Sequence, residues 1–277
     1  MKLSFGCELA YRVKEPTVVV LHVEAARIAS HADLVEELRI VPDLPRDSAT
    51  TPLTENRYTR IISPPGALNV AYRGSVDLRV QRADPATIGE LTPADLPLRV
   101  LPFLLPSRYC ESDRLGDFVK QQFGTLLPGF SRVTAVCNWI YDNVKYRAGS
   151  SDIHTSACRT LETRAGVCRD FAHLGVALCR AMDIPARFVS CYAFGLDPMD
   201  FHAVFEAYLD GHWWLFDPTR EPALDRMVRI GAGRDAADVS FASFFGAADL
   251  QSIRVWIEPK DRGVSAHERT VEAIRTA

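Results

Sequence analysis

The stretch Gly166-Val167-Cys168-Arg169-Asp170-Phe171-Ala172-His173-Leu174 decides the expected fold, because it places a cysteine at the beginning of a helix. After Cys168, apolar residues recur at helical spacing through Met182. Pro185 disfavours helical geometry in the residue before it, so the helix is expected to end near Asp183. The β-rich run from Arg187 to Tyr192 then predicts a strand.

A β-hairpin is expected next, around Asp210-Gly211, because an Asp-Gly pair between two β-rich runs is a strong turn signal. If these two residues form the loop, Leu209 faces His212 and Val204 faces Asp217. His202 shares a strand face with Val204, and its diagonal neighbour is Asp217, roughly 7–8 Å away at the backbone. The turn therefore predicts a histidine and a carboxylate within side-chain reach.

These residue types in this order are typical of nucleophilic catalysis. A thiol at a helix N-terminus beside an imidazolium favours thiolate. Cys168 is then the expected nucleophile, His202 the general base and acid, and Asp217 the group that fixes the ring tautomer. The Cys168 backbone N–H could also donate to an oxyanion, while no second donor is evident from the sequence.

Four motifs in this order resemble the core of the transglutaminase-like superfamily, and more narrowly the bacterial transglutaminase-like proteins described as candidate cysteine proteases. They are Gly166 to Leu174, Met182 to Ser190, His202 to Ala207 and Trp214 to Thr219, within a region of about residues 131 to 220. The resemblance implies an α+β, papain-like core and carries the triad onto Cys168, His202 and Asp217. Met182-Asp183 and Val204 stand where family members commonly have glycine and tryptophan.

Residues 1 to 105 are expected to form an antiparallel β domain, a sandwich or a single sheet. Helical periodicity is weak there, and turn residues separate the β-rich runs. These runs are Cys7 to Val13, Thr17 to Val23, Tyr58 to Ser63, Ala67 to Tyr72 and Ser75 to Gln81. The region also resembles the amino-terminal β domain of the bacterial group. The catalytic domain is expected to cover residues 106 to 277.

Composition excludes several other classes of function. The chain has 277 residues, 47% of them hydrophobic, and a formal net charge of −3. No lysine- or arginine-rich block supports nucleic-acid binding, and no signal-peptide core or stretch of about 18 apolar residues supports a membrane role. Seven cysteines without paired spacing suit reduced thiols. We expect a cytoplasmic protein whose partner is a peptide or protein substrate, and the oligomeric state stays open.

Neither a metal nor a cofactor is expected. His154, Cys158, Cys168 and His173 could form a zinc site on paper, but no C-x-x-C pair accompanies them and His173 is expected on the polar side of its helix. Gly231 and Gly233 lack the spacing and context of a phosphate loop. Glu206 is expected to pair with Arg187 or Arg169, or to remain solvated.

The leading expectation is a thiol-dependent hydrolase of amide or peptide bonds that acts through a thioester. Transfer of the acyl group to an amine, as in a protein-glutamine acyltransferase, shares the same first half of the reaction. A noncatalytic binding module is the alternative from another class. The amino-acid sequence does not separate hydrolysis from transfer.

Overall fold

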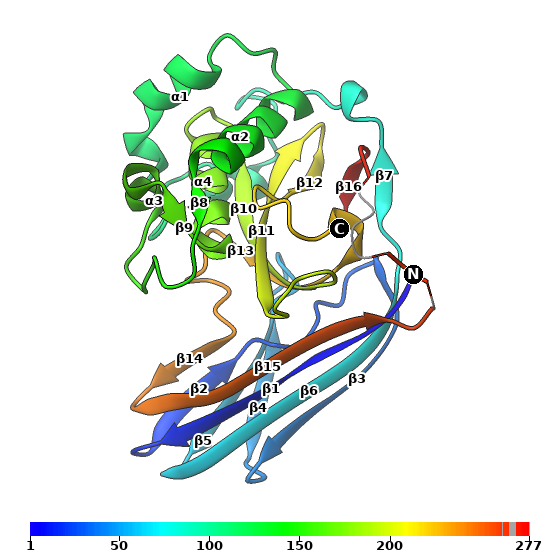
Figure 1. Cartoon of the computed structure of the whole chain (residues 1–277), viewed down its shortest axis with the longest axis vertical. Coiled ribbons are helices and arrows are strands. Elements are labelled where there is room, and N and C mark those ends of the chain that lie inside the picture. The colour runs from blue at the N-terminus through cyan, green and yellow to red at the C-terminus, as the bar shows by residue number, and fades with distance from the viewer. Residues whose placement is uncertain (262, 266–269, 277) are drawn as a thin grey trace.

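Two packed β-sheets and a third, helix-covered sheet make up the molecule, seen at the bottom and top of Figure 1. The computed structural model describes residues 1–261, 263–265 and 270–276. The fold class is mixed α and β, as the sequence indicates, with antiparallel main sheets. No helix in the described part of the chain is both long and apolar enough to cross a membrane.

The lower half of the molecule is an antiparallel sandwich. Its two four-stranded sheets have the orders β15-β1-β6-β3 and β14-β2-β5-β4. The strands are β1 (Lys2–Val13), β2 (Thr17–Leu21), β3 (His31–Val41), β4 (Arg46–Thr50), β5 (Arg57–Ser63), β6 (Gly66–Leu78), β14 (Ala242–Phe245) and β15 (Ala248–Pro259). Alternate β1 residues, from Leu3 to Val13, are buried between the sheets, as the period of two requires.

The upper half of the molecule contains the helices and a sheet of order β12-β11-β10-β13. Its elements are α1 (Gly116–Phe123), α2 (Phe130–Asn143), α3 (Ala157–Thr163), α4 (Cys168–Arg180), β10 (Ala186–Ala193), β11 (Phe201–Leu209), β12 (His212–Phe216) and β13 (Met227–Gly233). Two small sheets complete it: β7 (Gln81–Ala83) with β16 (Ala273–Arg275), and β8 (Lys145–Tyr146) parallel to β9 (Ala165–Gly166).

Helix α4 lies against β10 and β11 and is almost entirely buried. Gly175 permits this close approach, because a Cβ there would lie 2.5 Å from Cε1 of Phe205. Phe205, Ala207 and Phe216 continue the same apolar core from the sheet side. The packing fixes the beginning of α4 relative to the strands that carry His202 and Asp217.

The expected hairpin register is confirmed. Leu209 pairs with His212 and Phe205 with Phe216, and the turn residues Asp210 and Gly211 have φ values of 47° and 78°. Both values lie in the left-handed region that a type I′ turn requires. The predicted helix from Cys168 and the strand from Arg187 are also confirmed.

Other sequence expectations were incomplete. Strands β3 and β4 were missed, and the runs 67–72 and 75–81 belong mainly to the single strand β6. Residues 106–277 were assigned to one catalytic domain, but β14 pairs with β2 and β15 pairs with β1, so strand pairing crosses the expected boundary. Strands β14 and β15 therefore belong to the sandwich sheets, although they follow residue 105 in the chain. The domain division at residue 105 stays a prediction.

Candidate active site

Cys168 is the first residue of α4, and its neighbours hold the helix start in place. The Asp170 carboxylate accepts a hydrogen bond from the Val167 N–H at 2.9 Å, and Arg169 pairs with the same carboxylate at 3.1 Å. A Cβ on Gly166 would lie 2.7 Å from the Cβ of Asp170, so the chain enters the helix along a path that only glycine fits comfortably. Asp170 is therefore a helix cap that positions the thiol.

His202 and Asp217 meet within the protein interior. Nε2 of His202 lies 2.8 Å from Oδ2 of Asp217, and both side chains are almost completely buried. The other carboxylate oxygen, Oδ1, accepts hydrogen bonds from the N–H and the hydroxyl of Thr219, each at 2.8 Å. Asp217 is thus held on both sides, which fixes the plane of the imidazole ring.

Cys168 lies beside the ring of His202, close enough to affect the protonation of the imidazole. Burial disfavours a charged ring, but Asp217 and Cys168 outweigh it and raise the pKa of His202 to about 10. The three residues singled out in the sequence therefore lie together as a sulfur, imidazole and carboxylate chain.

Tyr146 is a further member of this site. Strand β8 pairs Tyr146 with Gly166, two residues before the cysteine, which brings the phenol close enough to Cys168 for the two side chains to interact electrostatically. Burial, together with the nearby Cys168 and Glu221, raises the pKa of the phenol. Sequence reasoning missed Tyr146, because the short parallel pairing of β8 with β9, which brings it to Cys168, has no recognisable local signal.

Glu206 pairs with Arg187, one of its two expected partners. Nε of Arg187 lies 2.5 Å from Oε2 of Glu206, and both side chains are buried between the sheet and the sandwich. Arg169 instead contacts Asp170. The ion pair lies four residues along β11 from His202, so it stiffens the strand that carries the imidazole.

His173 differs from its expected placement on a polar helix face. The residue is fully buried, with its ring between Tyr109 and Phe188 at centroid distances of 5.0 and 4.9 Å. Its Nε2 accepts a hydrogen bond from the Ala236 N–H at 3.1 Å, and burial lowers its pKa. Helical periodicity placed His173 opposite the main apolar face, but the segment around Ala236 covers that side too. Within residues 1–261, 263–265 and 270–276, no group of three or more potential ligands has metal-binding geometry.

The remaining cysteines lack such surroundings. Burial raises the pKa of Cys7 and of Cys158 to about 11, and it raises those of Cys110, Cys137, Cys179 and Cys191 as well. Cys168 is the one cysteine of the chain that is partly exposed. Cys168 is therefore the cysteine that combines solvent exposure with a neighbouring histidine.

Two family models match the chain. The transglutaminase-like superfamily model matches residues 117–218, and the model of the bacterial transglutaminase N-terminal domain matches residues 1–91. The first match contains the cysteine, the histidine and the aspartate of the candidate site. The second covers most of the sandwich strands.

Similar proteins agree with these matches. A solved structure of a candidate cysteine protease from Cytophaga hutchinsonii has a TM-score of 0.93 and 38% sequence identity, with 99% of this chain and 96% of that chain covered. An uncharacterized protein of Mycobacterium leprae is 34% identical over 137 residues, which are 44% of this chain and 48% of that protein. One from Mycobacterium tuberculosis is 32% identical over 143 residues, 46% of each.

The chain spans about half the length of the curated relatives it matches, whereas it covers nearly all of the Cytophaga hutchinsonii structure. Fold, both family models and full-length similarity to that structure agree with the motifs around Cys168, His202 and Asp217. The chain belongs to the transglutaminase-like superfamily, with a bacterial transglutaminase N-terminal domain ahead of its core.

Proposed function

We propose that this protein is a thiol-dependent hydrolase of amide or peptide bonds that works through a thioester on Cys168. The observation that carries the proposal is the buried hydrogen bond between His202 and Asp217 beside Cys168, the partly exposed cysteine at the start of α4. A ring with a pKa near 10 stays protonated at neutral pH, so it can stabilise a thiolate and later donate a proton. The Cytophaga hutchinsonii relative, described as a candidate cysteine protease, supports the same class of reaction.

The first half of the reaction forms the acyl-enzyme. The Cys168 sulfur attacks the carbonyl carbon of the substrate, and the carbonyl electron pair moves onto oxygen to give a tetrahedral intermediate. When the intermediate collapses, the C–N bond breaks and the His202 imidazolium gives its proton to the leaving nitrogen. The amine departs, and a thioester and a neutral imidazole remain.

The second half of the reaction releases the acid. His202 takes a proton from water as the water oxygen bonds to the thioester carbon. Breakage of the C–S bond then yields the carboxylic acid, the Cys168 thiolate and the imidazolium, so the starting state returns. Asp217 remains hydrogen-bonded to Nε2 throughout, which fixes the orientation of the imidazole ring.

Two donors are available for the oxyanion of each tetrahedral intermediate. The Cys168 N–H lies in the first turn of α4, where backbone amides have no partner within the helix. Tyr146 pairs with Gly166, two residues before Cys168, which brings its side chain near the thiol. We assign Tyr146 as the second donor, because an oxygen bonded to the attacked carbon would lie within reach of both groups.

The experiment that tests this function profiles the purified protein against a library of peptides and amides, with and without a primary amine. Cys168→Ala serves as the blank. Amide cleavage without amine incorporation supports the hydrolase. Incorporation of the amine would replace the proposal with an acyltransferase, since only the second nucleophile differs. If no library member is cleaved or modified with or without the amine, but the protein still binds some of them, a noncatalytic binding module is favoured.

A further inference from the structure

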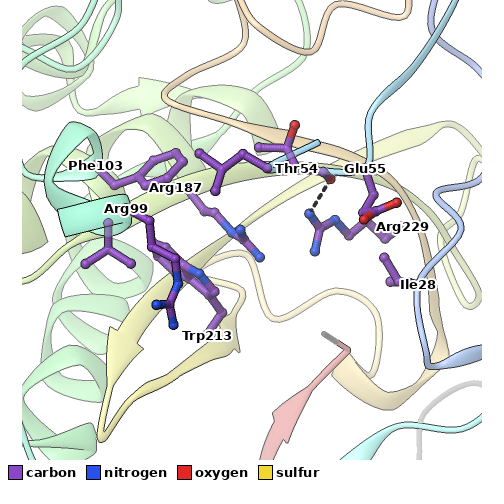
Figure 2. Close-up of a pocket in the computed structure, with 10 residues that line it drawn as sticks. Ile28, Thr54, Glu55, Arg99, Phe103, Arg187, Trp213 and Arg229 are labelled. Carbon is purple, nitrogen blue, oxygen red and sulfur yellow. Dashed lines mark hydrogen bonds between the residues drawn. The ribbon is translucent and has the colours of Figure 1, made fainter. Parts of the chain in front are cut away.

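A cavity of about 170 Å³ lies where the sandwich meets the face of the upper sheet that points away from α4 (Figure 2). One wall comes from β10, β12 and β13, which contribute Arg187, Trp213 and Arg229. The other walls come from Ile28, the β4–β5 connection and the 3-10 helix Leu98–Phe103. The cavity lies away from the thiol, because none of its lining residues belongs to the Cys168 site.

Arg229 is the most unusual residue of this cavity. Only 3% of it is exposed, yet its Nε and Nη1 atoms have no hydrogen-bond partner among the described residues. Its Nη2 donates to the Thr54 carbonyl at 3.0 Å, while Nη1 lies 3.9 Å from Oε1 of Glu206, beyond hydrogen-bond length. A buried guanidinium with unused donors is costly unless an acceptor reaches it.

Two further guanidinium groups line the same space. Arg187 lies 4.2 Å from the centre of the Trp213 ring and bonds to Glu206 through Nε, while Arg99 is exposed at the edge of the cavity. Figure 2 shows the Arg187 and Arg229 head groups directed toward one another. Burial and the positive charge of Arg187 together lower the pKa of Arg229 to about 10. An anion bound between Arg187 and Arg229 would offset both the burial of the Arg229 charge and its repulsion by Arg187.

The charged and apolar residues that line the cavity indicate which class of ligand it would bind. Three guanidinium groups face two carboxylates, Glu55 and Glu206, so one positive charge is left for a ligand to neutralise. The remaining walls carry apolar side chains: Ile28, Leu53, Val100 and Phe103. A single negative charge on a short hydrocarbon body matches both features.

We propose that this cavity binds a small organic monocarboxylate, with its carboxylate on Arg187 and Arg229 and its hydrocarbon part against Val100 and Phe103. The planar guanidinium fork favours carboxylate geometry, and the volume suits a short-chain acid. Nothing in this proposal depends on chemistry at Cys168.

Titration calorimetry with butyrate tests the proposal on the full-length protein, with butyramide as the uncharged ligand of matched shape. We expect butyrate to bind at least 10-fold more tightly than butyramide. Arg99→Gln should weaken butyrate binding about 3- to 10-fold, and Arg229→Gln should abolish it. Arg12→Gln, at an exposed arginine on β1, and Cys168→Ala should bind as the wild type does.

Several outcomes would overturn the proposal. These are no heat from either ligand, equal affinity for butyrate and butyramide, or wild-type affinity in a folded Arg229→Gln variant. Tighter binding of inorganic phosphate than of butyrate would overturn the carboxylate assignment. If circular dichroism shows that Arg229→Gln does not fold, the exposed Arg99→Gln variant decides, because its unchanged affinity would exclude the arginine cavity as the site.

Discussion

Oδ2 of Asp217 lies 2.8 Å from Nε2 of His202 because a two-residue turn folds β12 back onto β11 in one register. A register shift by one residue would move the residues of one strand to the opposite sheet face. The left-handed conformations of Asp210 and Gly211 prevent that shift. The turn, which lies far from the thiol, therefore sets the electrostatics of the imidazole.

Replacing Asp217 with asparagine should lower the pKa of His202 sharply. Burial opposes the charged ring, and it is mainly the Asp217 carboxylate that raises the pKa of His202 to about 10. Nuclear magnetic resonance titration of labelled histidine should place the wild-type midpoint near 10 and the variant midpoint below 6.5. His202→Gln identifies the resonance, and a midpoint that does not move would remove Asp217 as the partner of the ring.

Cys168 should react with iodoacetamide at least 10-fold faster than any other cysteine in the folded protein. It is partly exposed beside His202, whereas the other six are buried, with raised pKa values. Mass spectrometry of tryptic peptides after a timed pulse measures the rates. In denaturant the seven rates should converge, and preferential labelling of another cysteine before denaturation would count against the thiolate assignment.

The sequence features that correctly predicted structure are local ones. Helical periodicity after Cys168 and the Asp210-Gly211 turn each act over a few residues, so they predicted the helix start and the hairpin register. Asp183 illustrates a subtler case. It ends its turn at φ 59°, a left-handed conformation that glycine adopts most easily.

The features that could not be predicted depend on contacts between distant segments. Strand β15 joins β1 across more than two hundred residues, and nothing in either strand specifies the other. Likewise Tyr146 reaches Cys168 only through the β8–β9 pairing, and Ala236 covers a helix face that would otherwise suit a polar His173. In the same way, Ala273 and Ile274 are buried in β16, which pairs with the distant strand β7.

Substituting Gly175 with alanine should destabilise the protein by about 1–3 kcal/mol, the usual range for an overpacked core. The new methyl group would lie 2.5 Å from Cε1 of Phe205, so α4 or the ring must shift. Gly116→Ala is the matched control, because a Cβ there meets nothing within 4 Å. Urea denaturation followed by circular dichroism gives both values, and equal stabilities would show that the helix–sheet contact adapts freely.

Substituting Tyr146 with phenylalanine should lower kcat about 10²-fold with little change in KM, once a substrate is known from the library. Loss of one oxyanion donor removes stabilisation that is realised mainly in the transition state. Tyr141→Phe is the control, since that tyrosine on α2 has nearly the same exposure, 48% against 47%. A larger effect on KM than on kcat would make Tyr146 a substrate-binding residue, and no effect would leave Cys168 N–H as the sole assigned donor.

Acid should destabilise the protein between pH 6.5 and about 4 because of three buried histidines, His22, His31 and His173, whose pKa values are lowered by burial. Burial, aided by Arg229, lowers the pKa of His22 and of His31 to about 4. A depressed pKa means that the unfolded chain takes up the proton first, so the stability is present above pH 6.5 and is lost as the pH falls toward 4. His22 and His31 can each contribute up to roughly 3 kcal/mol at 1.36 kcal/mol per pH unit.

His22→Phe should therefore flatten the acid limb of this stability profile by about a third, because His31 and His173 still contribute. The ring lies 4.6 Å from that of Tyr58, and phenylalanine keeps this contact while removing the titrating nitrogens. Urea denaturation at half-unit pH steps from 7 to 4 measures the slope. His154→Phe, at an exposed position, is the control variant and should retain the wild-type slope. If His22→Phe folds normally and keeps the full slope, the acid sensitivity does not arise from His22. The next residue to replace is then His31, whose Nδ1 lies 2.7 Å from the Ala26 carbonyl oxygen.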